Sequence, residues 1–211
     1  VVVCDHTSGY YGKYKLLTTL VQLQSDITSP FPPLDLMVHI GEISAASFND
    51  TIPAKEVWRV SEDGELRDPF KKLTTVFQMS EEMFFLHYGK DGCNRHVLID
   101  ECRELFGEIY EQIPELPFCN IWTAMQLSSR LPKGALFHMG VSNTRRCWNM
   151  FQLPESVESA CNVGCCGIDG CVSTLVGASL VNPDRLCYVV VGDLTFFYDL
   201  NSLGNHHIGT N

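Results

Sequence analysis

Short apolar runs alternate with longer amphipathic segments along most of the chain. Residues 34–40 form an apolar run that Gly41 closes, as expected for a strand buried on both faces. Residues 186–191 form a second run and give the clearest strand signal in the sequence. Residues 97–112 instead repeat apolar side chains at helical spacing. This alternation predicts an α/β fold, with parallel sheets and flanking helices in three αβα layers.

The same patterns predict further elements. Residues 55–60 alternate apolar and polar side chains, which indicates a strand. Ser80 is a good N-cap, and Glu81 and Glu82 supply acidic first-turn residues for a helix that runs to His87. The remaining predicted strands are residues 1–4, 73–79 and 135–139, and the remaining predicted helices are residues 10–24, 120–131, 169–180 and 195–203.

Charge and hydropathy argue against two classes of partner. A net charge of -10 disfavours a nucleic-acid surface, which needs a basic stripe. No apolar run approaches the roughly 20 residues that cross a bilayer, and no signal peptide is visible. We therefore expect a cytoplasmic protein with no nucleic-acid or membrane partner. The chain opens on Val1-Val2-Val3 rather than Met, and we expect that it begins inside a larger protein.

The chain contains 10 cysteines, and four of them, Cys161, Cys165, Cys166 and Cys171, lie close together. Their spacing lacks paired CxxC motifs and no His lies among them, so a metal or iron–sulfur site is the less favoured alternative. We expect reduced thiols that fill tight places between a loop and a helix. His206-His207 could form a metal pair, but adjacent side chains point in different directions, which favours solvated histidines.

The strand predicted at residues 186–191 leads directly into Gly192 and Asp193. In open parallel sheets, ligands bind beyond the carboxyl ends of the strands. Glycine allows the backbone to approach a bulky anion, and an aspartate oxygen is a suitable ligand for Mg²⁺. A simple turn explains a lone Gly-Asp pair equally well, so the pair alone is weak evidence for a metal–phosphate site.

Two further predicted strand ends strengthen this interpretation. Residues 162–170 form a glycine-rich loop before a helix of small residues, although Asp169 could be an ordinary N-cap there. Residues 140–146 combine hydroxyls with Arg145 and Arg146, whose guanidinium groups could bind carboxylate or phosphate. The alternative for that segment is a pair of surface arginines. Three such strand ends in succession favour one shared cleft over three unrelated turns.

These motifs resemble those of thiamine-diphosphate-dependent enzymes, in particular the menaquinone-pathway synthase that joins decarboxylated 2-oxoglutarate to isochorismate. Residues 192–201, Gly-Asp-Leu-Thr-Phe-Phe-Tyr-Asp-Leu-Asn, are similar to the cofactor motif of that family. Residues 142–146 and 167–170 are similar to two further motifs, in the family's order and spacing. Residues 34–41 and 56–60 resemble its middle domain, so the resemblance covers nearly the whole chain.

The resemblance implies that thiamine diphosphate and Mg²⁺ are the cofactors. Asp193 matches the Mg²⁺ ligand that fixes the diphosphate, and Ile168 matches the apolar residue that supports the bent cofactor. The cofactor-binding positions that it implies are Ser142, Gly167, Ile168, Gly192, Asp193 and Leu194. Arg146 matches a residue that faces the substrate carboxylates, so the implied partner is a small-molecule 2-oxo acid. The cofactor supplies the reactive carbon, while the protein supplies orientation and electrostatics.

The sequence departs from the family pattern at two places. Val163 stands where the family usually has Arg, and residues 142–146 lack the usual apolar middle. Loss of a cation weakens the case for a dicarboxylate or isochorismate substrate, because buried carboxylates depend on paired charges. We therefore expect a divergent branch that acts on another 2-oxo acid.

By resemblance, residues 1–90 are a partial middle domain and residues 91–211 are the N-terminal part of the diphosphate-binding domain, with a hinge at Gly89-Lys90-Asp91-Gly92. The family's activating Glu and a second Mg²⁺-ligating Asn match no residue here, so no catalytic residue is assigned and we expect no turnover by this chain alone. The parent protein should be at least a homodimer. Two alternatives remain open: a simple 2-oxo acid decarboxylase or acetolactate-synthase-like enzyme, and a non-catalytic α/β module that only binds a nucleotide or a partner.

Overall fold

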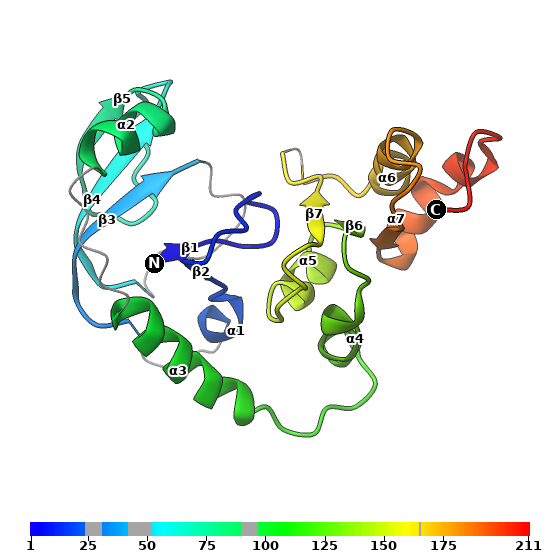
Figure 1. Cartoon of the computed structure of the whole chain (residues 1–211), viewed down its shortest axis with the longest axis horizontal. Helices are drawn as coiled ribbons and strands as arrows, with labels where there is room; N and C mark the ends of the chain where they lie inside the picture. Colours follow the sequence, from blue (N-terminus) through cyan, green and yellow to red (C-terminus); the bar gives the residue numbers. More distant parts are fainter. Residues whose placement is uncertain (24–30, 42–51, 90–96, 165) are drawn as a thin grey trace. The chain divides into compact units, whose positions relative to one another are not determined.

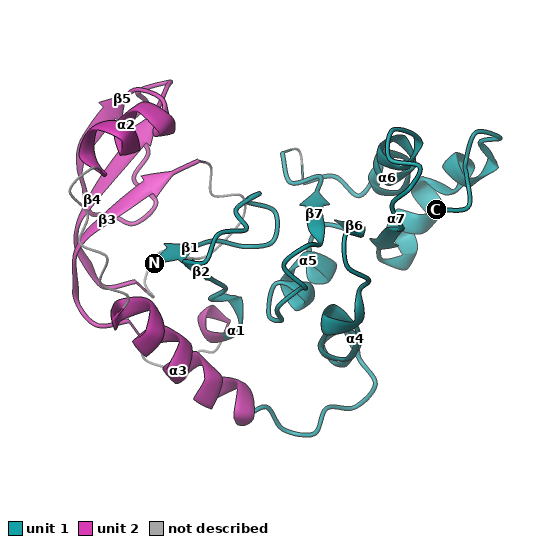
Figure 2. Ribbon diagram, viewed as in Figure 1, with its two compact units in different colours: residues 1–20, 112–211 teal, residues 21–111 magenta. Residues whose placement is uncertain are grey.

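The computed structural model describes residues 1–23, 31–41, 52–89, 97–164 and 166–211, and these form two compact units. Unit 1 comprises Val1–Leu20 and Gln112–Asn211, and unit 2 comprises Val21–Glu111 (Figures 1 and 2). The first 20 residues thus belong with the C-terminal half of the chain. The assignment of residues 1–90 and 91–211 to two family domains stays a prediction, and the compact units have different bounds.

Unit 2 contains a three-stranded parallel sheet in the order β3-β4-β5. Its strands are β3 (Leu34–Ile40), β4 (Ala54–Ser61) and β5 (Leu73–Gln78). We expected β3 to be buried on both faces, and this was wrong, since Leu36 and Ile40 are more than a third exposed. In the described sheet β3 is an edge strand that pairs with β4 alone, so its faces are less covered than those of a central strand.

Aromatic side chains hold helix α2 (Glu81–Tyr88) against this sheet. The Phe77 ring on β5 lies 5.0 Å from the Phe84 ring and 5.5 Å from the Tyr88 ring, measured between centroids. The Ser80 hydroxyl accepts a hydrogen bond from the Met83 backbone N–H at 3.3 Å, which confirms the predicted N-cap. The predicted amphipathic helix is also present as α3 (Val97–Glu111). Residues 90–92 of the predicted hinge lie outside the described residues.

Unit 1 begins with two short parallel strands, β1 (Val2–Val3) and β2 (Lys15–Leu16), followed by α1 (Thr19–Gln22), which ends in unit 2. The helix predicted over residues 10–24 is therefore wrong, apart from the single turn of α1. Pairing of Lys15–Leu16 with Val2–Val3 replaces the local helical pattern with a strand, a case of tertiary contacts overriding intrinsic preference.

The main sheet of unit 1 is parallel, with β6 (Leu136–Met139) between β7 (Glu158–Cys161) and β8 (Cys187–Val190). Helix α5 (Asn143–Trp148) connects β6 to β7, and α6 (Cys171–Leu180) connects β7 to β8. These two crossovers run in opposite directions across the sheet, so right-handed connections place α5 and α6 on opposite faces. The predicted α/β class with flanking helices is confirmed (Figure 1).

Unit 1 is completed by α4 (Asn120–Leu127), the 3₁₀ helix η1 (Ser128–Arg130), α7 (Asp193–Tyr198) and the 3₁₀ helix η2 (Leu200–Gly204). The Trp148 ring at the end of α5 packs on Phe137 of β6, with 4.6 Å between ring centroids. Among the described helices of both units, none is long and apolar enough to span a bilayer.

Candidate functional site

The three strands of the unit 1 sheet end at the same level. Met139, the last residue of β6, pairs with Cys161, the last of β7, and with Val190, the last of β8. The ladder continues one step further, because the Gly140 N–H donates to the Val190 carbonyl at 2.7 Å. The loops after β6, β7 and β8 therefore leave from one edge of one sheet, and the shared cleft that we expected there stays a prediction. This is the edge at which open α/β sheets bind ligands.

The loop after β6 turns sharply at Ser142, which has φ 65° and ψ -124°. This combination is strained for any residue with a Cβ and costs on the order of 1–3 kcal/mol. Two residues earlier, a Cβ on Gly140 would lie 3.3 Å from the Val191 Cα, so only glycine fits comfortably beside β8. The close approach of Gly140 to β8 and the tight turn after it leave Ser142 exposed at the edge where β6, β7 and β8 end, which we call the strand-end edge.

The two arginines of α5 have different environments. Arg145 is buried and forms an ion pair with Asp5, with 3.5 Å between Nη1 and Oδ2, whereas Arg146 is exposed. Successive residues on a helix point about 100° apart, which accounts for the difference in exposure between Arg145 and Arg146. The alternative of two surface arginines is therefore wrong for Arg145. Arg146 remains the arginine of α5 that a ligand could reach.

Asp5 anchors a loop of the N-terminal segment to α5. Its Oδ2 accepts from Asn149 Nδ2 at 3.3 Å in addition to the Arg145 ion pair. Its Oδ1 accepts from the Thr7 backbone N–H at 2.8 Å and from the Thr7 hydroxyl at 2.6 Å, which closes a tight turn. Both oxygens of the Asp5 carboxylate therefore have partners, which fixes the position of this side chain.

His6 adds a second set of bonds to the same region. Its backbone N–H donates to Asn149 Oδ1 at 2.9 Å, and its carbonyl accepts from the Ser159 hydroxyl of β7 at 2.6 Å. Its Nε2 lies 2.8 Å from the Phe151 carbonyl, which can only accept, so Nε2 carries the proton. Burial lowers the pKa of His6 to about 4, so the ring is neutral at neutral pH.

The loop after β7 carries Gly167 and Ile168, both half-buried, and ends at Gly170 with φ 80°. The Ser173 backbone N–H, in the first turn of α6, donates to Asp199 Oδ2 at 2.6 Å. Asp199 lies just after α7, so its carboxylate joins the loop after β7 to the segment after β8. The buried aspartate also satisfies the positive end of α6, a role that the sequence did not indicate.

The segment after β8 presents Gly192 and the first two residues of α7, Asp193 and Leu194, all exposed. A Cβ built on Gly192 would meet no atom within 4 Å, so the space beside it is open. Within the described residues, the Asp193 side chain forms no ion pair or hydrogen bond, so no structural contact occupies it. The carboxylate is thus accessible at the strand-end edge, as a metal ligand must be.

No group of three or more His, Cys, Asp or Glu able to hold a metal by itself occurs among the described residues. The eight described cysteines are free thiols, while Cys93 and Cys165 lie outside the described residues. Burial raises the pKa of Cys161 to about 11, so this thiol stays protonated at neutral pH and is a poor metal ligand. A metal bound at Asp193 would need further ligands from the bound molecule or water.

The sequence did not reveal the contacts of Asp5, His6 and Asn149 with the α5 region. Asp5 and Arg145 are separated by 140 positions in the chain, and no local periodicity encodes such a pair. The visible signal was Asp5 followed by Thr7, which is typical of a side-chain-closed turn but says nothing of the partner.

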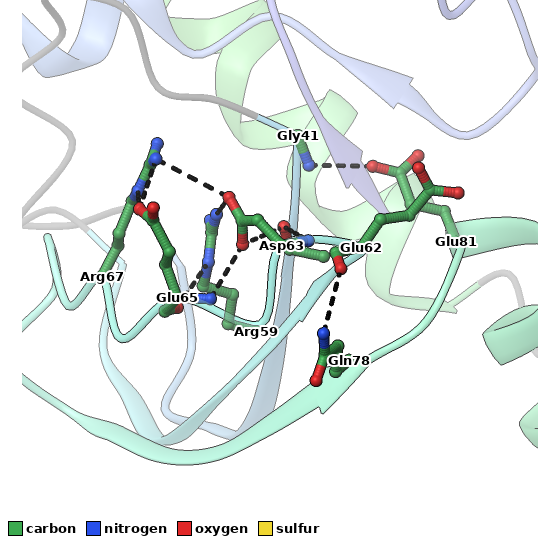
Figure 3. Close-up of polar contacts among 9 residues, drawn as sticks. Gly41, Arg59, Glu62, Asp63, Glu65, Arg67, Gln78 and Glu81 are labelled. Atoms are coloured by element: carbon green, nitrogen blue, oxygen red, sulfur yellow. Dashed lines mark hydrogen bonds and ion pairs between the residues drawn. The ribbon is translucent and has the colours of Figure 1, made fainter.

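Unit 2 has a cleft of about 570 Å³ at the carboxyl ends of β3, β4 and β5. Its lining residues are Gly41, Val60, Ser61, Glu62, Asp63, Ser80, Glu81 and Glu82. Figure 3 shows the polar contacts here: Glu81 Oε1 accepts from the Gly41 backbone N–H at 2.9 Å, and Asp63 forms ion pairs with Arg59 and Arg67.

These contacts disfavour a nucleotide phosphate in the unit 2 cleft. The Gly41 N–H is a group that could bind a phosphate oxygen, and the Glu81 carboxylate already bonds it. Glu62 and Glu82 add negative charge to the same lining, which repels an anion. The geometry gives no support to the alternative of a nucleotide-binding module.

The chain has an open α/β fold, and its sequence is similar to segments of known enzymes. The relatives that it matches are named synthases, and no family model matches the chain. More particularly, these relatives are 2-succinyl-5-enolpyruvyl-6-hydroxy-3-cyclohexene-1-carboxylate synthases, so the chain is homologous to a segment of that synthase family. The resemblance predicted from the motifs is confirmed.

The synthase of Bacteroides fragilis is 36% identical over 165 residues, which cover 75% of this chain and 28% of the relative. The synthase of Christiangramia forsetii is 38% identical over 101 residues, or 48% of this chain and 17% of the relative. The synthase of Syntrophus aciditrophicus is 27% identical over 219 residues, or 96% of this chain and 38% of the relative. The chain thus spans well under half the length of each of these proteins.

We predict that Ser142→Gly stabilises unit 1. Glycine adopts positive φ without the Cβ clash, so the variant should gain about 1 kcal/mol in free energy of unfolding, measured by urea denaturation. Asn143→Gly is the matched control, because the neighbouring residue is helical and should lose about 0.5–1 kcal/mol. Equal losses in both variants would show that Ser142 is not strained.

We also predict that acid destabilises unit 1 through His6. The pKa of His6 is about 4 in the folded chain against an ordinary value of about 6.5 in the unfolded chain, so the unfolded chain takes up the proton first. The contribution is fully present above pH 6.5 and is lost as pH falls to about 4, up to about 3 kcal/mol in total. Urea midpoints measured across this window should show the loss.

His6→Gln should remove this part of the pH dependence, while His207→Gln, at an exposed position, should retain it. Burial also lowers the pKa of His138, which adds a slope of the same sign to all three proteins and cancels in the comparison. A His6→Gln chain whose midpoint falls as steeply as that of the parent would contradict the assignment.

Proposed function

We propose that this chain is part of a thiamine-diphosphate- and Mg²⁺-dependent enzyme of menaquinone biosynthesis type. The intact enzyme decarboxylates a 2-oxo acid and transfers the product to an acceptor. The observation that carries the proposal is that β6, β7 and β8 end on paired residues. The three segments that resemble the family's motifs therefore begin at one edge of the sheet. The similarity to the synthases supports the same conclusion.

The residues at this edge fit a diphosphate with its metal. The open space beside Gly192 leaves room for a bulky anion, and Asp193 offers one accessible carboxylate. Mg²⁺ is commonly bound by one or two carboxylates together with ligand phosphates and water, so a site without three protein ligands is suitable. We assign Ser142, Gly167, Ile168 and Leu194 to the remaining cofactor contacts by their place on the same loops.

When bound, thiamine diphosphate supplies the carbon nucleophile and the electron sink for decarboxylation. The chain's own contribution is orientation. Asp193 fixes the metal end, and Ile168, half-buried on the neighbouring loop, supplies an apolar contact for the cofactor's body. Arg146 binds a carboxylate of the 2-oxo acid through its planar guanidinium.

The substrate assignment rests on Arg146. Arg145 is buried against Asp5, and Val163 supplies no charge, so α5 and the loop after β7 together offer one exposed guanidinium. One cation suits a 2-oxo acid better than a ligand with several buried carboxylates. We propose a 2-oxo acid other than the one used by the typical synthase, and a parent protein that is at least a homodimer.

We predict that Asp193→Asn weakens binding of thiamine diphosphate in the presence of Mg²⁺ by about tenfold or more, because the neutral amide oxygen attracts Mg²⁺ less strongly than the charged carboxylate does. Isothermal titration calorimetry on the whole chain gives the affinity. Asp184→Asn is the matched control, since Asp184 is also exposed but precedes β8 at the opposite edge of the sheet. Equal affinity in all three proteins would refute the assignment of Asp193.

We further predict that the chain by itself releases no CO₂ from 2-oxoglutarate when Mg²⁺ and thiamine diphosphate are added. The activating Glu that the family requires matches no residue here, so the cofactor would not reach its reactive form. A coupled CO₂ assay measures this, with Asp193→Asn as the background control. Release above that control would overturn the prediction.

A further inference from the structure

Helix α5 is too short to hold its own geometry. It contains six residues, whereas isolated helices shorter than about 12 residues are marginal in water. It also begins directly after Ser142, whose backbone is strained. Strained residues persist only when the surrounding structure holds them in place. The turn after β6 therefore depends on contacts from outside α5.

Those contacts come from the sheet and from the N-terminal segment. Trp148 packs on Phe137 of β6 and fixes the C-terminal end of α5. Asp5 binds Arg145 and Asn149, which lie one helical turn apart, and the His6 N–H also donates to Asn149. Asp5 and His6 of the N-terminal segment thus bind both α5 itself, at Arg145, and the position just after it, Asn149.

We propose that Asp5, with Asn149, is a positioning residue that holds α5 so that Ser142 and Arg146 stay at the strand-end edge. Because Arg145 and Arg146 are adjacent on the helix, an ion pair that fixes the rotation of one also fixes the direction of the other. Asp5 itself does not contact the ligand. The inference deepens the proposed function and rests on it for the identity of the ligand.

Loss of Asp5 should weaken the binding of one ligand and leave the other unchanged. Asp193 begins α7 after β8, and Ile168 lies on the loop after β7. Asp5 bonds neither residue, so their hold on the cofactor should survive the loss of Asp5. Arg146 lies on α5, so binding of the 2-oxo acid should weaken when Asp5 is lost. A residue that merely stabilises the fold would weaken both equally.

The test uses the whole chain and the near-isosteric variant Asp5→Asn. Hydrogen–deuterium exchange should become about tenfold faster in peptides covering residues 141–149 and unchanged in those covering β8. Calorimetry with pyruvate, a 2-oxo acid with a single carboxylate, should show its dissociation constant raised at least about fivefold, and that of thiamine diphosphate with Mg²⁺ changed by less than about twofold. Asp5→Glu, which keeps the charge, should restore most of the pyruvate affinity.

Asp35→Asn is the matched control, because it removes an exposed aspartate ion pair in unit 2. A double variant tests the strain itself: in a Ser142→Gly background, Asp5→Asn should accelerate exchange much less, since little strain is left to release. Equal acceleration in both backgrounds would refute the link to Ser142.

Exchange that is unchanged in Asp5→Asn, or faster throughout unit 1, would overturn the positioning role whatever the ligand data show. Equal weakening of both ligands would also overturn it. Faster local exchange in a protein whose parent form binds neither ligand would support the hold of Asp5 on α5 and refute the proposed function instead. The two failures are therefore distinguishable.

Discussion

The backbone ladder that joins β6 to β7 and β8 is the constraint on which the candidate site depends. Each strand ends on the residue that pairs with the ends of its neighbours, so three loops distant in sequence begin side by side. A shift of one residue in either pairing would move one loop away from the other two and reverse the faces of its strand. Close approach at Gly140 and the Asp199 bond to the start of α6 then fix the loops themselves.

Much of this arrangement could be predicted from the sequence, because it is encoded locally. The apolar run before Gly192, the Ser80 cap with its acidic first turn and the helical spacing of residues 97–112 each specify one element without help from distant residues. The shared edge followed from topology, since parallel strands with crossovers carry their ligand loops at one end. The cofactor and substrate roles of the individual residues remain predictions.

The parts that could not be predicted depend on contacts between distant segments. Residues 10–24 have a helical pattern, yet a two-residue strand pair with Val2–Val3 and a bond from the Ser159 N–H to the Tyr11 hydroxyl determine their course. The burial of Arg145 and the cap from Asp199 are likewise invisible in periodicity, because both partners look like ordinary surface charges in sequence. The exposure of β3 followed from its place at the edge of the described sheet, which its apolar composition does not reveal.

The division of unit 1 into two chain segments has a consequence for folding. Unit 2 lies between them in sequence, so a ribosome delivers all of unit 2 before it delivers most of unit 1. Residues 1–20 emerge before unit 2 but have no α5 or β7 to contact until much later in synthesis. Contacts between such distant positions form slowly, because a long stretch of chain must be closed into a loop first. During that interval His6 is solvated and can be protonated near its ordinary pKa, and the nascent segment is open to chaperones and proteases.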